Sequence, residues 1–197
     1  MTLKLQNYST DKWISGAGSG QSIISALDGS VVAVTGSEGL DFAAMLTHAR
    51  TVGSQGLRAL TFHQRANILK ALAQALMARK EELYALSAAT GASRGDSWID
   101  IEGGAGTLFT MASKGRRELP DDMIIVDGDH ELIGKTGTFI GQHVYTSLHG
   151  AALHINAFNF PVWGMLEKLG PTLLAGVPQS SNRPPQPLRL RNMRFGS

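Results

Sequence analysis

The chain has 197 residues, of which 43% are hydrophobic and 17% charged, a composition that allows one buried core. It has no cysteine, which excludes a disulfide framework, a thiolate metal site and a thiol nucleophile among these residues. No apolar run approaches the roughly 20 residues that span a bilayer, and the first residues lack the apolar stretch of a secretory signal. A cytoplasmic protein is therefore expected.

The positive charge of the chain is confined to its end. The formal net charge is +2, and residues 179–197 carry four arginines and no acid. Residues 1–178 are left with 14 lysines and arginines against 16 acids. The body of the chain therefore has no basic stripe of the kind that binds nucleic acid.

Two short extended segments are predicted first, at residues 12–16 and 29–35. The glycine cluster between them, residues 16–20, lacks the lysine and hydroxyl residue of a P-loop and the glycine spacing of a dinucleotide fingerprint. A flexible turn is predicted there. An alanine-rich helix follows at residues 40–52, with Ser37 or Asp41 as its N-terminal signal.

A long amphipathic helix is predicted from Thr61 to about Ala89. Thr61 and Gln64 match a capping box, in which a hydroxyl and an amide three residues later satisfy the first N–H groups. The apolar residues recur in four- and three-residue steps, which predicts one buried face: Phe62, Ala66, Leu69, Ala73 and Leu76. Most charged residues of this helix, beginning with Arg65, are expected in solvent, and Gly91 supplies a stop.

Asp96 is the predicted cap of a third helix, which continues past Trp98 and Phe109 towards Ser113. After Pro120, residues 123–126 and 138–146 are predicted strands, which form a hairpin or an excursion from the main body.

A nearly continuous apolar run at residues 150–158 predicts a strand buried on both faces. Asn159, Phe160 and Pro161 then turn the chain, with Pro161 in the first turn of a helix. Leu166, Leu169 and Leu173 mark the apolar face of this helix, and Gly176 is its predicted C-cap. Strand, turn and helix make half of a βαβ unit, whose ligands bind beyond the carboxyl ends of the strands, where Asn159 is expected to lie.

Two motifs that suggest metal sites are weak. Residues 127–131 alternate acids as a calcium loop does, but Leu132 and Thr138 occupy the positions that need glycine and glutamate, so a solvated hairpin turn is predicted. His149 and His154 have no third ligand nearby in the sequence, so packing or surface roles are favoured over zinc.

Residues 155–161 read Ile-Asn-Ala-Phe-Asn-Phe-Pro, which resembles the aldehyde dehydrogenase motif I-T-P-W-N-F-P. The match continues through Gly-Pro-Thr-Leu-Leu-Ala-Gly-Val-Pro at residues 170–178, and residues 65–83 resemble the family's long early helix. Other segments resemble one branch, the bifunctional ring-opening enzyme of phenylacetate catabolism, which joins an aldehyde dehydrogenase to a hydratase domain. These segments are residues 37–41, 57–62, 96–98, 100–104 and 154–161. The semialdehyde dehydrogenase of the benzoyl-CoA pathway is also similar.

The resemblance implies an α/β fold, the N-terminal part of an aldehyde dehydrogenase. Residues 1–178 would form the first part of a Rossmann-like cofactor-binding domain, with long early helices and an oligomerisation-type hairpin at about residues 123–146. The implied function is that of an oxidoreductase that oxidises a CoA-linked semialdehyde to the acid in aromatic catabolism. NADP is the implied cofactor, with NAD as the alternative. A homo-oligomer is implied, and no nucleic-acid, membrane or metal partner is expected.

By resemblance, Asn159 is the catalytic oxyanion donor. In the family a cysteine thiolate attacks the aldehyde, and a side-chain amide N–H stabilises the negative charge that develops on the carbonyl oxygen. The backbone of the four preceding residues would line the nicotinamide-ribose side as cofactor-binding residues: Ile155, Asn156, Ala157 and Phe158. From the residues alone, the alternative is that Asn159 only caps the helix after the strand.

The match stops abruptly after Pro178. The family continues with a lysine that binds the cofactor ribose, whereas residues 179–185 read Gln-Ser-Ser-Asn-Arg-Pro-Pro. Codons for this segment, preceded by one added G, can be read as Ala-Ile-Val-Lys-Pro-Ala, which is the family's own continuation. Residues 179–197 are therefore expected to be a non-family basic tail, translated out of frame after a single-base deletion. A genuine basic linker is the alternative.

Such a chain would lack the family's catalytic cysteine, general-base glutamate and ribose-binding lysine, so this chain itself is expected to be inactive. The alternative function is that of a non-catalytic truncated pseudoenzyme or interaction fragment, which pairs with full-length subunits through the hairpin. Nucleic-acid binding by the four arginines is the weakest of the three hypotheses.

Overall fold

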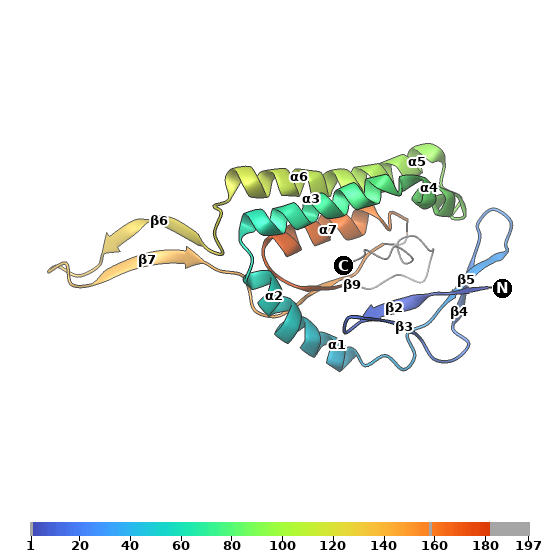
Figure 1. Ribbon diagram of the computed structural model, residues 1–197, viewed down its shortest axis with the longest axis horizontal. Coiled ribbons are helices and arrows are strands. Elements are labelled where there is room, and N and C mark those ends of the chain that lie inside the picture. The colour runs from blue at the N-terminus through green and yellow to red at the C-terminus, as the bar shows by residue number, and fades with distance from the viewer. Residues whose placement is uncertain (1, 158, 182–197) are drawn as a thin grey trace.

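The computed structural model describes residues 2–157 and 159–181, and these form an α/β structure, which confirms the predicted fold class. Three helices, α3, α6 and α7, lie side by side as a layer, with the short strands on one side of it (Figure 1). The β6–β7 hairpin projects from one end of the molecule (Figure 1). The larger hydrophobic core lies within the helical layer.

The N-terminal strands confirm the two predicted extended segments. β1 (Leu3–Lys4) pairs in parallel with β5 (Val31–Thr35), which pairs antiparallel with β4 (Gln21–Ile24). β2 (Gln6–Ser9) and β3 (Lys12–Ser15) form a separate antiparallel pair. The glycine-rich segment joins β3 to β4, and a Cβ on Gly16 would overlap the backbone of Gly36. Close packing of two backbone segments therefore explains this glycine.

The first predicted helix comprises α1 (Phe42–His48), a wider π-helical segment η1 (Ala49–Gly53) and α2 (Ser54–Arg58). Of its two candidate caps, Asp41 is the one used, because its carboxylate accepts a hydrogen bond of 2.8 Å from the N–H of Ala44.

The long amphipathic helix is present as α3 (Phe62–Ala78) and α4 (Lys80–Ala88). Both halves of the predicted capping box form between Thr61 and Gln64. The predicted apolar face is buried in full. The two helices are divided at Arg79, where φ is −112°, and the chain leaves α4 through Gly91, which has φ of +76°.

The prediction that Arg65 lies in solvent is wrong. Its side chain is fully buried, with its guanidinium 4.4 Å from the centre of the Phe62 ring. The Nε and Nη1 groups donate to the carbonyl oxygen of Thr61 at 3.4 Å and to Oγ of Ser147 at 3.3 Å. The chain between β7 and β8 passes over this face of α3, which the pattern within the helix does not reveal.

The third helix is longer than predicted, and it begins at a different cap residue. It consists of α5 (Arg94–Trp98), the π-helical η2 (Ile99–Gly103) and α6 (Gly104–Glu118). The cap is Ser93, whose hydroxyl accepts from the N–H of Asp96. The predicted cap, Asp96, is the third residue of the helix, and its carboxylate accepts from the N–H of Ser93 to complete a capping box.

β6 (Ile125–Leu132) and β7 (Ile140–Tyr145) form the predicted hairpin. Residues 127–131 lie in β6, with a shift of register between Asp127 and Glu131, so the prediction that they form the turn is wrong. The turn lies at residues 133–139. Within the described part of the chain, no three histidine or acidic side chains gather as metal ligands would.

The predicted strand, turn and helix form a βαβ unit. β8 (Ala152–His154) leads to α7 (Trp163–Leu174), and β9 (Gln179–Ser181) returns in parallel beside β8. Pro161 lies before the helix and not in its first turn, since Val162 is the N-cap residue. The C-cap of α7 is Ala175, one residue before the predicted Gly176, which turns the chain with φ of +76°.

Burial of the 150–158 strand on both faces is not observed. Leu153 in β8 is 68% exposed, because α7 covers one face of the two-stranded sheet and the side chain of Leu153 points to the other. Among residues 2–157 and 159–181, no helix is long and apolar enough to cross a bilayer.

Candidate active site

A hollow lies between the end of β8 and the start of α7, at the position predicted for Asn159. Its volume is about 420 Å³. It is lined by Ile99, Ala157, Asn159, Phe160, Trp163, Gly164, Glu167 and Lys168. Two of the predicted site residues, Ala157 and Asn159, therefore share one surface, and both are exposed. Ile155 is 69% exposed at the end of β8, and Phe158 lies outside the described residues.

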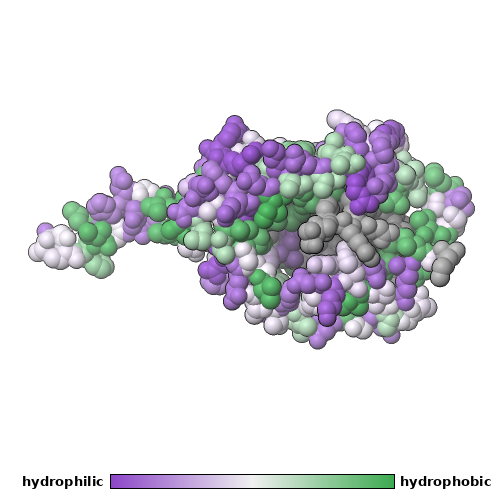
Figure 2. Space-filling view, in the orientation of Figure 1, coloured by the Kyte–Doolittle hydropathy of each residue, from purple (hydrophilic) through white to green (hydrophobic). Residues whose placement is uncertain are grey.

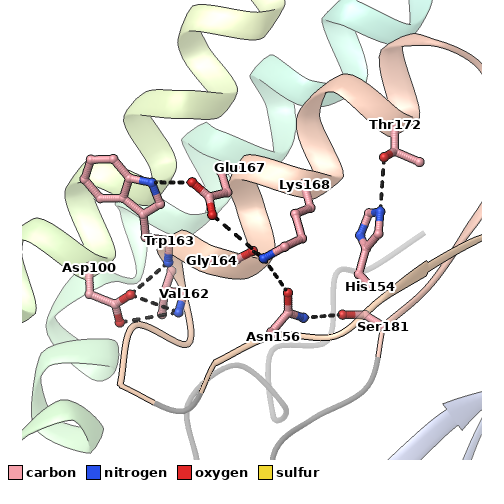
Figure 3. A network of polar contacts seen from close by, with 10 residues as sticks. All are labelled: Asp100, His154, Asn156, Val162, Trp163, Gly164, Glu167, Lys168, Thr172 and Ser181. Carbon is pink, nitrogen blue, oxygen red and sulfur yellow. Dashed lines mark hydrogen bonds and ion pairs between the residues drawn. The ribbon is translucent and has the colours of Figure 1, made fainter.

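The N-terminus of α7 is fixed by a carboxylate from another helix. Asp100, in η2, accepts hydrogen bonds from the N–H groups of Trp163 at 2.8 Å and Val162 at 3.1 Å (Figure 3). Asp100 is only 3% exposed. A negative charge is favourable at this end of a helix. Because a protein carboxylate already occupies these donors, they are not available for a phosphate group of a nucleotide.

Trp163 forms one wall of the hollow and is held from two sides. Its indole N–H donates to the carboxylate of Glu167, one helical turn later, at 3.0 Å (Figure 3). The ring also packs on Gly103, where any Cβ would overlap the ring atoms. The absence of a side chain at position 103 therefore determines where the indole lies.

Asn156 does not present its side chain to the hollow. It is 6% exposed, its Oδ1 accepts from Nζ of Lys168 at 3.3 Å, and its Nδ2 donates to Oγ of Ser181 at 2.7 Å (Figure 3). Lys168 also donates to the carbonyl oxygen of Gly164 at 2.7 Å. These contacts join β8, α7 and β9, and they engage the side chain of Asn156 away from the hollow.

His154, two residues before Asn156, is also buried against α7. It is 8% exposed, and its Nε2 is 3.1 Å from Oγ1 of Thr172 (Figure 3). Burial lowers the pKa of His154, the ammonium of Lys168 lowers it further, and the side chain of Gln179 acts in the opposite direction. The imidazole is consequently favoured in its neutral form, and the packing role predicted for it is confirmed.

A second hollow, of about 310 Å³, lies between α4 and α5 and contains none of the predicted site residues. Its main feature is Arg94, whose guanidinium lies 3.4 Å from the centre of the Tyr84 ring and pairs with Glu81 at 3.1 Å. Burial raises the pKa of Tyr84 to about 12, assisted by its hydrogen bond to Glu102. These contacts join α4 to α5 and η2, and no catalytic group lies among the described residues that line this hollow.

Sequence reasoning missed the residues of η2 and α7 that shape the hollow around Asn159. Asp100 and Gly103 lie 55 and 52 positions before Ile155, where the motif begins, and Trp163 and Glu167 follow the motif on α7. The i, i+4 spacing of Trp163 and Glu167 on a predicted helix was the one local signal that could have paired them.

The chain is similar to known aldehyde dehydrogenases in sequence. Residues 13–178 match the model of the aldehyde dehydrogenase family. A 3,4-dehydroadipyl-CoA semialdehyde dehydrogenase of Aromatoleum evansii is 40% identical over 177 residues, which cover 89% of this chain and 34% of that protein. The chain thus spans about a third of the length of its curated relative.

Solved structures with the same fold are more distant in sequence. An Escherichia coli NADP-dependent enzyme superposes with a TM-score of 0.71 at 19% identity, over 91% of this chain and 36% of the other. Aldehyde dehydrogenase 21 of Physcomitrella patens, in complex with succinate, has a TM-score of 0.72 at 17% identity, over 92% and 37%. From the match over residues 13–178 and the 40% identity to the semialdehyde dehydrogenase, the chain belongs to the aldehyde dehydrogenase family.

Proposed function

We propose that the protein from which this chain derives is an NAD(P)-dependent oxidoreductase that oxidises a CoA-linked semialdehyde to the acid in aromatic catabolism. The observation that carries the proposal is the position of Asn159, in a hollow between the end of a parallel strand and the start of the next helix. Open α/β sheets bind ligands at this place. The identity with a relative named for such a semialdehyde supports the substrate class.

Asn159 is the proposed oxyanion donor. When a nucleophile attacks an aldehyde, the carbonyl oxygen takes up negative charge, and an amide N–H held against it lowers the barrier. One such donor contributes roughly 3–4 kcal/mol. Asn159 is exposed and lines the hollow, so a carbonyl there would be within reach of its amide. Since Asp100 caps α7, the alternative in which Asn159 serves only as the helix cap loses its support.

The residues before Asn159 are placed to contact one side of a bound dinucleotide. Ile155 and Ala157 are exposed at the carboxyl end of β8, where the backbone can lie against a flat ring or sugar. The side chain of Asn156 is engaged with Lys168 and Ser181, so its contribution would come from its backbone alone. A bound nicotinamide would supply the hydride acceptor, and NADP is proposed ahead of NAD on the resemblance to the phenylacetate branch.

The chain as it stands is proposed to be catalytically inactive, because it contains no cysteine to act as the nucleophile. The restored reading frame predicted after Pro178 would supply the remaining residues. We also propose a cytoplasmic location.

Assembly through the β6–β7 hairpin is part of the proposal. Apolar side chains are exposed along it, among them Leu132, Phe139 and Tyr145 at 66%, 62% and 60%. Figure 2 shows apolar patches on the projecting hairpin. Exposed apolar surface of this kind marks protein interfaces. It supports a homo-oligomer, and it equally favours the second candidate function, a non-catalytic fragment that joins full-length subunits.

The test compares the 197-residue chain with a version in which one base is added after the Pro178 codon. The longer protein is expected to form NADPH in the presence of an unbranched CoA-linked semialdehyde, and the 197-residue chain is expected to form none. NADPH formation by the short chain would contradict its inactivity. A longer protein that folds but oxidises no aldehyde would refute the proposed activity. Co-purification of the short chain with an intact dehydrogenase would favour the second candidate.

A further inference from the structure

The segment that carries Asn159 joins β8 to α7, and side-chain hydrogen bonds hold it at both ends. Three residues before Asn159, the side chain of Asn156 bonds to α7 and to β9. Three and four residues after it, the N–H groups of Val162 and Trp163 donate to the carboxylate of Asp100 (Figure 3). Asn159 itself is exposed and lines the hollow. The two held ends therefore restrict where its backbone can lie.

The hydrogen bonds on the α7 side are made by a buried carboxylate. Val162, the N-cap residue, is fully buried and has no polar side chain that could accept the first N–H groups of the helix. Asp100 is also buried, and its two oxygens lie 3.1 and 3.4 Å from the backbone nitrogen of Val162. Hydrogen bonds to an ionised acceptor are roughly twice as strong as those between neutral groups. The start of α7 thus depends on a residue from another helix.

The helix that supplies Asp100 is shaped to receive this part of the chain. Its π-helical turn η2 leads directly into α6, which packs on α7 through the larger hydrophobic core. A Cβ on Gly103 would overlap the Trp163 ring, and a Cβ on Gly104 would lie 3.0 Å from Cα of Trp163. Asp100 and both glycines therefore contact the same short segment, residues 162–163. Wide turns of this kind occur frequently at functional sites.

We propose that Asp100 is a positioning residue for aldehyde oxidation, which holds the amide of Asn159 where negative charge develops on the carbonyl oxygen. It acts through the N–H groups of Val162 and Trp163 and does not itself touch the substrate. The inference rests on the proposed function, in which Asn159 is the oxyanion donor. A preorganised donor stabilises the transition state because it needs no rearrangement during the reaction. A displacement of about 1 Å can cost a factor of about 100 in rate.

A purely structural cap would behave differently from a positioning residue. If Asp100 only stabilised α7, its replacement would lower the stability of the chain and leave Asn159 as rigid as before in the molecules that stay folded. If Asp100 positions Asn159, its replacement would loosen Asn159 within the folded protein. The mobility of Asn159 in the folded state therefore distinguishes the two roles, and it can be measured without turnover.

The asparagines of the 197-residue chain are labelled with isotopic nitrogen, and the signal of Asn159 is assigned with Asn159→Ala. The backbone order parameter of Asn159 is measured in the original chain, Asp100→Ala and Asp100→Asn. Asn67, in α3, is the rigid reference within each spectrum. Asp41→Ala is the matched control, because the Asp41 carboxylate also caps a helix, at 2.8 Å from the backbone nitrogen of Ala44.

In the original chain the order parameter of Asn159 is expected to be about 0.85, the value of rigid backbone, and in Asp100→Ala it should fall below about 0.6. Asp100→Asn keeps one acceptor oxygen, so a smaller fall is expected, and this variant decides the result if Asp100→Ala does not fold. Asp41→Ala should leave Asn159 unchanged. An Asn159 that is mobile in the original chain, or equally rigid in the folded Asp100 variants, would overturn the inference.

Turnover of the protein with the added base gives the second test. Asp100→Ala is expected to lower kcat for NADPH formation by about 10- to 100-fold in the original sequence. Combined with Asn159→Ala it should lower kcat by less than about threefold, because it acts through that amide. Equal fold losses in both backgrounds would overturn the inference and leave the proposed function standing. If the protein with the added base oxidises no aldehyde, the proposed function fails, and the order parameters alone decide whether Asp100 positions Asn159.

Discussion

The carboxylate of Asp100 accepts the backbone N–H of Trp163 at 2.8 Å, although 63 positions separate the two residues in the sequence. This bond ties the π-helical turn η2 to the first turn of α7. It therefore fixes the helix that carries one wall of the hollow at Asn159.

Asp100→Ala is expected to destabilise the chain by about 1–3 kcal/mol, because it leaves two N–H donors at the start of α7 without their acceptor in a buried place. Asp100→Asn should cost less, since one acceptor oxygen remains. Urea denaturation measures the free energies of unfolding. Asp129→Ala, at an exposed position in β6, is the control and should change stability by less than about 0.5 kcal/mol. If Asp100→Ala and Asp129→Ala lowered the free energy of unfolding equally, the capping role of Asp100 would be contradicted.

Stability should fall on mild acidification through His154. Burial and Lys168 hold the folded-state pKa of His154 below its ordinary value of 6.5, so the unfolded chain binds a proton first as the pH falls. The stabilisation that depends on a neutral His154 is then fully present above about pH 6.5 and is lost as the pH drops below it. The groups facing the imidazole are Lys168, Thr172 and Gln179.

The measurement compares the unfolding free energy at neutral pH and below the unfolded pKa for the original chain and His154→Gln. The variant is expected to lose less stability on acidification than the original. Parallel pH profiles for the original chain and His154→Gln would rule out this contribution.

Gly176→Ala is expected to be destabilising for two reasons that can be separated. Its φ of +76° costs an L-residue about 1–2 kcal/mol, and its Cβ would overlap Nη1 of the buried Arg65. Gly29→Ala is the matched control, because Gly29 has φ of +72° and nothing within 4 Å. Gly176→Ala should destabilise the chain by about 1–3 kcal/mol more than Gly29→Ala, which is the usual cost of overpacking.

Arg65→Met should relieve part of that excess, since it removes the guanidinium that the new methyl group would strike. A double-mutant cycle on thermal or urea unfolding measures the coupling between the two positions. Additive effects of the two substitutions, or equal costs of Gly29→Ala and Gly176→Ala, would contradict the proposed contact.

DNA sequencing tests the origin of residues 179–197. A single added base after the Pro178 codon is expected to open a frame that reads Ala-Ile-Val-Lys-Pro-Ala and continues as an aldehyde dehydrogenase. The family match ends at residue 178, where this frame change is predicted. Downstream DNA with no such continuation in any frame would reject the deletion.

The local elements were largely predictable because their signals lie within a few residues of each other. The capping box at Thr61, the apolar face of α3 and the αL glycines at positions 91 and 176 depend on neighbours along the chain. The motif at residues 155–161 likewise indicated the place of Asn159 at the end of a strand.

The contacts between elements were not predictable in the same way. Arg65 was predicted in solvent from its charge, although its spacing, three residues after Phe62 and four before Leu69, places it on the apolar face of α3. There the segment that contains Ser147 contacts it. Asp100 and Gly103 shape the hollow from a helix whose packing on α7 no local pattern reveals. Leu153 shows the reverse case, in which an apolar residue lies exposed because α7 covers only one face of β8 and β9.

The most direct test of the central claim is the turnover of the protein with the added base, compared between the original sequence and Asn159→Ala. If Asn159 donates to the developing oxyanion, the rate of NADPH formation should fall by a factor of roughly 100–1,000, with the thermal midpoint little changed. An Asn159→Ala protein that forms NADPH as fast as the original would contradict the assignment of this site.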